Sequence, residues 1–266
     1  MSKRNSQAAK SAARERLRAE REREAKRAKA KRQAVVALSV VGVLAAAGGI
    51  GYAVVQANQP SAWDEAAKAT VVAPANASGK NGTTVTIGES KSDNVVHLYE
   101  DPRCPGCAAF EQNVGEAVNK GMEDGDYKLT FTIGTFLDGN LGGEGSKNAL
   151  SALGAALNVS PEAFLDYKAA LYSTEYHPEE STDEFAKDDY LIKVADTVDA
   201  LKGNKKFQND VREGTYDAWA LKMSDTFQKT KDVKSTPTLK INKTVIETPS
   251  TPDDWQKALK DAGVTK

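Results

Sequence analysis

The chain has 266 residues, including two cysteines and two histidines, and a formal net charge of −1. Two cysteines in one short motif exclude a framework of long-range disulfides, and His97 and His177 add no convincing set of metal ligands. The charge is segregated, because thirteen Lys or Arg and four Asp or Glu lie in residues 1–32, which leaves 23 basic and 33 acidic residues in the rest. A basic head and an acidic body indicate two different environments.

Residues 1–33 are predicted to form a polar helix or a disordered tail rich in Ala, Arg, Glu and Lys. A nucleic-acid-binding arm is one interpretation of such a basic segment. We favour a solvated cytoplasmic flank that touches anionic lipid, because the segment adjoins an apolar stretch and has no interleaved aromatic residues. We therefore expect no nucleic-acid partner.

An uncharged stretch follows this head. No charged residue occurs between Gln33 and Trp63, and residues 34–55 are rich in Val, Ala, Leu and Gly. About 20 apolar residues suffice for a transmembrane helix, and the basic flank predicts a cytoplasmic N-terminus with the later residues outside the cell membrane. A cleavable signal peptide is the alternative, since Val-Gln-Ala at 55–57 resembles a cleavage site. We favour a retained single-pass anchor, because the apolar run exceeds the usual ~7–15 residues of a signal peptide.

Residues 56–81 are predicted to be a linker, because they show no sustained periodicity and are rich in Ala, Asn, Ser and Lys. The folded body is predicted to comprise residues 82–266. Its first elements are predicted to be a strand, a buried strand, a helix and a strand, at 83–87, 94–99, 105–120 and 128–137. Gly121 would stop the helix. The buried strand, the helix and the last strand read as a βαβ unit, so these two strands should be parallel.

The second half of the body is predicted to be mainly helical. Apolar residues at steps of three and four predict helices at 146–157, 161–172, 183–201 and 210–229. Two short β-branched runs, 238–241 and 244–247, would then form a hairpin that turns at Asn242 and Lys243. Thr251 and Pro252 would open a last helix.

The motif Cys104-Pro105-Gly106-Cys107 lies where the predicted buried strand ends and the helix begins. The free N–H groups and the dipole of a helix start stabilise a thiolate, which is the nucleophilic form of cysteine. A spacing of three places Cys107 one turn further in, so the two sulfurs can close a disulfide. We expect Cys104 to be the exposed nucleophile and Cys107 the shielded thiol that resolves a mixed disulfide. Pro105 suits the first turn of a helix, where its missing N–H is not needed.

A purely structural disulfide and a metal site are the alternatives for this motif. Closing a loop of about four residues stabilises a protein by only ~2 kcal/mol in the chain-entropy model, and a body of this size has its own core. Two thiolates without nearby ligands do not fill a tetrahedral metal site. Redox chemistry is therefore favoured, and no metal or organic cofactor is expected, since the two sulfurs carry the electrons.

Two stretches resemble a known family. Residues 95–111, VVHLYEDPRCPGCAAFE, resemble the active-site strand and helix of DsbA-like thioredoxin-fold proteins of the membrane-anchored bacterial type. Residues 235–242, STPTLKIN, resemble the Thr-Pro loop and the following strand of that family. The resemblance covers residues 83–263 and implies an α/β thioredoxin-like fold, here preceded by the transmembrane helix, with a helical insertion at about 144–231.

The resemblance also assigns roles to the Thr-Pro loop. It implies that Pro237 is cis and faces the active-site disulfide, and that the backbone of Thr236 pairs with a substrate strand. The residues alone leave an ordinary trans turn proline open as the alternative.

The chain departs from the family pattern near the cysteines. Leu98 stands where members often carry a buried carboxylate, and Glu100 and Asp101 are nearby but shifted, so we assign neither a proton-accepting role. Gly106 stands where strongly oxidising members carry His. Arg103 would compensate by favouring the thiolate, but an exposed arginine would be screened by solvent.

These features together predict a membrane-anchored, extracytoplasmic thiol–disulfide oxidoreductase that oxidises dithiols in exported proteins. Disulfide reduction or isomerisation is the alternative activity, and a non-enzymatic tethered binding module is the alternative class. The expected partners are exported or membrane proteins with cysteines and a membrane protein that recycles the redox state. Because Gly106 offers only its backbone N–H, we expect a moderately favoured Cys104 thiolate and a pair less oxidising than in His-containing relatives.

Overall fold

The computed structural model describes residues 61–89 and 93–264, together with single positions between residues 10 and 31 that are helical and exposed. The chain divides into Met1–Pro60 and a compact body, Ser61–Lys266. The predicted membrane span at 34–55 lies outside the described residues, as does most of the predicted basic segment. Within the part that is described, no helix has the length and apolar character needed to cross a bilayer.

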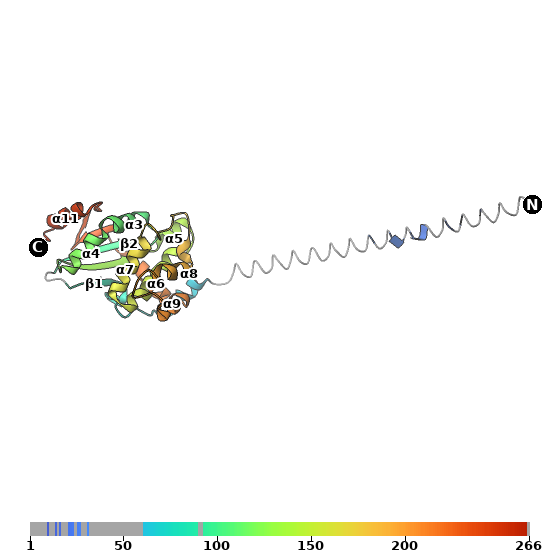
Figure 1. Cartoon of the computed structure of the whole chain (residues 1–266), viewed down its shortest axis with the longest axis horizontal. Helices are drawn as coiled ribbons and strands as arrows, with labels where there is room; N and C mark the ends of the chain where they lie inside the picture. The colour runs from blue at the N-terminus through green and yellow to red at the C-terminus, as the bar shows by residue number, and fades with distance from the viewer. Residues whose placement is uncertain are drawn as a thin grey trace, which may run out of the picture. The chain divides into compact units, whose positions relative to one another are not determined.

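A mixed sheet forms the centre of the body, and its described strands follow the order β1-β3-β2-β4-β5 (Figure 1). The strands are β1 Val85–Ile87, β2 Val95–Glu100, β3 Lys128–Ile133, β4 Thr238–Ile241 and β5 Thr244–Ile246. β2 and β3 run parallel, as the βαβ pattern predicted, and every other neighbouring pair is antiparallel. The predicted strands therefore all exist, with small differences at their ends.

Alternation along β2 decides which side chains enter the main core. Val96 and Leu98 pair with Leu129 and Phe131 of β3 and are buried with them on one face. Successive side chains of a strand point to opposite faces, so Glu100 enters the same face as Leu98. The strand thus carries a carboxylate into an apolar core, directly before the turn that leads to Cys104.

The helix after β2 is longer and less regular than predicted. It comprises α3 Pro105–Phe110, a π-helical turn Glu111–Gly115 and α4 Glu116–Glu123. The prediction that Gly121 stops the helix is wrong, because Gly121 lies inside α4. A glycine is needed there because a Cβ atom would collide with the hydroxyl of Tyr127.

The end of β3 also differs from the prediction. The strand stops at Ile133 and not at residue 137, and a short helix α5, Phe136–Leu141, follows. At Gly134, between the two elements, a Cβ atom would lie 2.7 Å from the ring of Phe227. Long-range packing of that ring, which no local pattern reveals, therefore favours glycine at this position.

A helical block interrupts the sheet between β3 and β4, where the insertion was predicted. Its main helices are α6 Gly145–Val159, α7 Pro161–Tyr172, α8 Asp188–Ala195, α9 Lys205–Arg212 and α10 Asp217–Lys229. The single helix predicted at 210–229 is divided at Gly214, whose φ of 61° no L-residue adopts easily. The helix predicted at 183–201 is reduced to a 3₁₀ turn and α8. In Figure 1, α8 and α9 lie at the opposite end of the body from α11, Pro252–Asp261.

The described part of the predicted linker packs on this block. Trp63, in the short helix α2 Ala62–Ala66, is buried, and the ammonium of Lys147 lies 5.1 Å from its ring centroid. Asn76 donates to the carbonyl of Leu157 at 2.8 Å. Burial of a large indole and this hydrogen bond thus attach the described part of the predicted linker to the body at Trp63 and Asn76.

Candidate active site

The two cysteines lie at the start of α3, where the turn after β2 delivers them. Cys104 is the N-cap residue, and its N–H donates to the carbonyl of Asp101 at 2.9 Å. Pro105 occupies the first helical position, as predicted. Both cysteines are free thiols, with Cys104 8% exposed and Cys107 fully buried. This is the geometry expected of an outer nucleophile and an inner resolving thiol.

The two thiols differ sharply in acidity. Hydrogen bonds from the Cys107 thiol, from the side chain of Thr236 and from the N–H groups of Cys107 and Gly106 lower the pKa of Cys104 to about 6, against the opposing effect of burial. Burial, the bond to Cys104 and the carboxylate of Glu100 raise the pKa of Cys107 well above its usual range. The Cys104 thiolate is thus the major form at neutral pH, which is more than the moderate preference expected from the sequence.

The Thr-Pro loop closes over the motif. The bond between Thr236 and Pro237 is cis, as the family resemblance implied, and the Cys104 thiol lies 3.4 Å from the carbonyl oxygen of Thr236. A Cβ atom at Gly106 would lie 3.1 Å from Cδ of Pro237. All the site residues predicted from the two motifs, about 130 residues apart in the chain, are therefore brought together.

Arg103 does not act as predicted. It is only 3% exposed, and its guanidinium forms ion pairs with Asp138 at 3.1 Å and Asp183 at 3.3 Å. The same group donates to the carbonyl of Gly142 at 2.8 Å. The charge of Arg103 is therefore used to hold the loops of the helical block against the active-site turn, and it is not available to the Cys104 thiolate.

Asp101 is a second anchor of this turn. Its buried carboxylate accepts hydrogen bonds from the hydroxyl of Ser146 at 2.6 Å and from the N–H groups of Arg103 and Leu137 at 3.1 Å. Tyr172 donates its hydroxyl to the carbonyl of Asp101. Burial raises the pKa of Asp101 to about 6 despite these donors. These bonds tie β2, α5, α6 and α7 to the residues just before Cys104.

A buried charge network lies behind the cysteines. The ammonium of Lys168 in α7 is 3.4 Å from the carboxylate of Glu100 and 2.6 Å from that of Glu111 in the π-helical turn. Burial raises the pKa of Glu100 to about 7, although Lys168 opposes this rise. Glu100 and the thiols of Cys104 and Cys107 influence one another electrostatically. Glu100, to which the sequence analysis assigned no proton-accepting role, is thus close enough to the cysteines for its charge to raise the pKa of Cys107.

Gly115, the last residue of the π-helical turn, makes room for Glu111 to reach Lys168. A Cβ atom at Gly115 would lie 2.8 Å from the carboxyl carbon of Glu111 and 3.0 Å from both its oxygens. The missing side chain at Gly115 thus leaves room for the carboxylate to fold back over the helix. Glu111 stands seven residues after Cys104, a spacing of two helical turns. This spacing places both residues on the same side of a helix and would have indicated Glu111 as a neighbour of the site.

Sequence reasoning missed Lys168, Tyr172, Asp138 and Glu111 as neighbours of the motif. Lys168 and Tyr172 come from α7 of the insertion, whose placement over the active-site helix no local pattern gives. As to metals, the described residues contain no group of three or more His, Cys, Asp or Glu side chains placed to hold an ion.

A family model described as "Thioredoxin" matches residues 80–261, which is more than half of the chain. The chain belongs to the thioredoxin family. Its cysteine pair at a helix start and its cis-proline loop are thus parts of a thioredoxin-like α/β fold with a helical insertion.

Solved structures of thioredoxin-fold oxidoreductases are similar to this chain. Oxidised DsbA of Mycobacterium tuberculosis aligns with a TM-score of 0.58 and 28% identity over 69% of this chain and 93% of that one. The reduced disulfide bond oxidoreductase DsbG of the same organism aligns with a TM-score of 0.57 and 27% identity over 68% and 86%. The structural neighbours of the chain are therefore thiol–disulfide oxidoreductases.

A sequence relative of another kind shares part of the chain. The serine/threonine-protein kinase PknE of Mycobacterium tuberculosis is 25% identical over 121 residues, which are 44% of this chain. The chain spans about a fifth of that kinase, 21% of its length. The similarity concerns a shared region and says nothing of the rest of the kinase.

Proposed function

We propose that the chain oxidises pairs of cysteine thiols in exported proteins through the Cys104–Cys107 disulfide. The observation that carries this proposal is the placement of the two thiols, with Cys104 at the start of α3 beside the Thr236–Pro237 loop and Cys107 buried behind it. In this setting the pKa of Cys104 is lowered to about 6 and that of Cys107 is raised. A disulfide is a strong oxidant when its reduced form is stabilised, and a stable Cys104 thiolate does this.

The cycle begins with the oxidised pair. A client thiolate attacks Sγ of Cys104, a client–Cys104 disulfide forms, and the Cys104–Cys107 bond breaks with release of the Cys107 sulfur as a thiolate. The second client thiolate then attacks the client sulfur of the mixed disulfide and releases the Cys104 thiolate. Two client thiols are oxidised to one disulfide, and the pair takes up the two electrons.

The direction of the exchange, toward oxidation of the client, follows from the acidity of the thiol that is released. A thiol of low pKa leaves faster, so release of Cys104 from the mixed disulfide to form the client disulfide is favoured. Cys107, buried and of raised pKa, takes up a proton once it is released. We propose that Glu100, whose charge raises the pKa of Cys107, supplies that proton or accepts it in the reverse step, because its own pKa of about 7 lets both forms exist at neutral pH.

The Thr236–Pro237 loop supplies the client-binding edge in this proposal. The carbonyl of Thr236 lies beside the Cys104 sulfur, so an extended client segment would place its cysteine there while pairing with the loop backbone. We further propose that the body acts outside the cell membrane, held by the apolar stretch at 34–55, and that a membrane protein reoxidises the pair. The basic head and the uncharged stretch of the sequence support this location.

The test uses the full chain. Oxidised protein should transfer its disulfide stoichiometrically to a reduced dithiol peptide, and a glutathione titration should give an oxidising potential for the Cys104–Cys107 pair. Cys104→Ser should abolish transfer. Efficient reduction or reshuffling of a disulfide client without net oxidation would favour a reductase or isomerase instead. Tight client binding with no exchange would identify a tethered binding module.

The location is tested separately. A cysteine-reactive reagent that cannot cross membranes should label the reduced protein in intact cells. Labelling only after lysis would contradict an extracytoplasmic body.

A further inference from the structure

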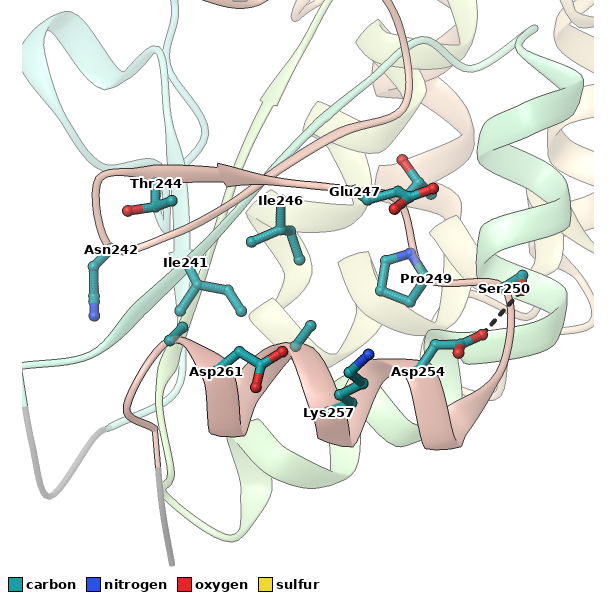
Figure 2. A pocket seen from close by; sticks show the side chains of 13 residues that line it. Ile241, Asn242, Thr244, Ile246, Glu247, Pro249, Ser250, Asp254, Lys257 and Asp261 are labelled. Atoms are coloured by element: carbon teal, nitrogen blue, oxygen red, sulfur yellow. Dashed lines mark hydrogen bonds between the residues drawn. The ribbon is translucent and has the colours of Figure 1, made fainter.

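A groove of about 720 Å³ lies between the β4–β5 hairpin and α11, and no member of the cysteine motif or Thr-Pro loop lines it (Figure 2). From the hairpin, Ile241 and Ile246 point toward the helix. From α11, the side chains of Lys257 and Asp261 point back toward the hairpin. With Ala258 and Ala262 also lining it, the groove has an apolar floor between two polar rims.

One wall of the groove is an open sheet edge. β5 ends the strand order among the described residues, and Val245 at its centre is 46% exposed. The pair Ile241–Thr244 closes the hairpin, and bonded pairs alternate in an antiparallel ladder, so the N–H and C=O of Val245 face away from β4. Such an edge accepts an added strand, and a helix beside it provides pockets for alternate side chains.

The rims carry an excess of negative charge. Glu247 and Asp261 are exposed, and neither has an ion-pair partner in the described part of the chain. Asp254 accepts hydrogen bonds from Ser250 at 3.0 Å and Thr251 at 2.8 Å and remains ionised, since these bonds lower its pKa. Against these three carboxylates, the groove presents the single ammonium of Lys257. A basic side chain would therefore complement it.

The groove is also within reach of a client polypeptide bound at the Thr-Pro loop. Leu239 pairs with Ile246, so Glu247 lies level with Thr238, the residue after Pro237. Neighbouring strands are about 4.8 Å apart, so a strand added to β5 would lie roughly 10 Å from β4. Three or four extended residues span that distance. A polypeptide that pairs with the Thr236–Pro237 loop can thus continue into the groove.

We infer that the groove binds an extended segment of the client polypeptide, which pairs with β5, places an apolar side chain over Ile246 and presents a basic side chain to Glu247 and Asp261. This inference rests on the proposed function in that the occupant is a client of the Cys104–Cys107 pair. The groove is then a second subsite, and it selects clients with a basic and apolar segment a few residues from the reacting cysteine.

The experiment compares two dithiol peptides that share one cysteine-containing core. One carries an extension of alternating Lys and Val, and the other an extension of alternating Glu and Ser. The full chain, oxidised beforehand at the Cys104–Cys107 pair, should react in a single turnover with the Lys-Val peptide, with a second-order rate constant at least about tenfold higher than with the Glu-Ser peptide. Dithiothreitol, which is too small to reach the groove, serves as the measure of basal oxidation.

Two variants separate the contributions of backbone and charge. Val245→Pro removes an outward N–H at an edge position where proline is tolerated, and Glu247→Lys with Asp261→Lys reverses the rim charge. Each should cancel the preference for the Lys-Val peptide and leave dithiothreitol oxidation unchanged. The control, Asp199→Lys with Glu213→Lys, changes exposed charges elsewhere to the same extent and should keep the preference.

Each contrary outcome has a distinct meaning. Equal rates for the two peptides in the unaltered chain would overturn the inference. A concentration-dependent dimer that Val245→Pro dissociates would also overturn it, since the edge would then pair two copies of the chain. If the chain failed to oxidise dithiothreitol, the proposed function would fail, while binding of a cysteine-free Lys-Val peptide would still test the groove.

Discussion

The carboxylate of Glu100, at the end of strand β2, lies 3.4 Å from the ammonium of Lys168 in helix α7. One residue belongs to the thioredoxin sheet and the other to the helical insertion, 68 positions later. Lys168 also binds Glu111 on the cysteine-bearing helix, and all three side chains are buried or nearly so. The insertion therefore supplies a charge that acts on the acidity of the active site, in addition to covering it.

Glu100→Gln should slow the attack of Cys107 on a mixed disulfide. Above its pKa of about 7 the Glu100 carboxylate accepts the Cys107 proton, so this step should accelerate in the unaltered chain as the pH rises through about 7. Loss of a general base costs on the order of 10²-fold at the lower end of its range. Stopped-flow decay of the glutathione mixed disulfide between pH 5 and 9 measures this. The partly exposed Glu184→Gln is the control, and a Glu100→Gln profile that keeps the rise near pH 7 would refute the role.

Cys104 should be alkylated with a midpoint near pH 6, because only its thiolate reacts and its pKa is about 6. Cys107 should resist labelling up to pH 9, since burial raises its pKa. In Cys107→Ala the midpoint at Cys104 should move up, because the thiol hydrogen bond that contributes most to the lowered pKa is lost. Iodoacetamide labelling with mass spectrometry follows both sites.

Variants at each of the two cysteines also show which thiol attacks first. Offered client peptides that carry a disulfide, Cys107→Ala should accumulate mixed disulfides, because the Cys104 thiolate attacks the client disulfide and the resolving thiol is gone. Accumulation in Cys104→Ser instead would reverse the two roles.

Gly106→His should make the pair more oxidising, because an imidazole beside Cys104 adds a donor or positive charge to the thiolate. Each tenfold change in the exchange equilibrium corresponds to about 30 mV. The new Cβ would lie 3.1 Å from Cδ of Pro237, so the loop must yield by a few tenths of an ångström. Gly106→Ala has the same crowding without the ring and is the matched control. A glutathione titration in which His is no more oxidising than Ala would contradict this reasoning.

Arg103→Gln should destabilise the body by about 3–5 kcal/mol, because it leaves the buried Asp138 without its ion-pair partner. The comparison is Arg212→Gln, which breaks an ion pair to Asp189 whose side chains are 51% and 84% exposed and should cost no more than about 1 kcal/mol. Urea unfolding of both variants gives the two free energies. Equal and small losses would show that Arg103 does not anchor the active-site turn.

Much of the fold could be predicted from the sequence, because strands and helices produce regular local spacings of apolar residues. The pattern at 94–99 predicts a buried strand, and the spacing of apolar residues at 161–172 predicts the helix α7; both are observed. Two of the failures share one cause. At Gly121 and Gly134 the glycine makes room for an aromatic side chain from elsewhere in the chain. Local sequence alone predicts a helix stop at Gly121 and gives no role to Gly134.

The sequence by itself determined the cysteine pair and its position at a strand-to-helix junction, because residue type and spacings of three or four depend only on the nearest turn of chain. The role of the loop at Thr236–Pro237 was implied by the family resemblance. Only the tertiary structure decided that Arg103 is buried in ion pairs, that Glu100 meets Lys168 and that the Cys104 thiolate is stabilised as far as it is. These properties depend on burial and on distances between groups far apart in the chain. Burial and neighbouring charges set the electrostatic energy of an ionised group and hence its pKa.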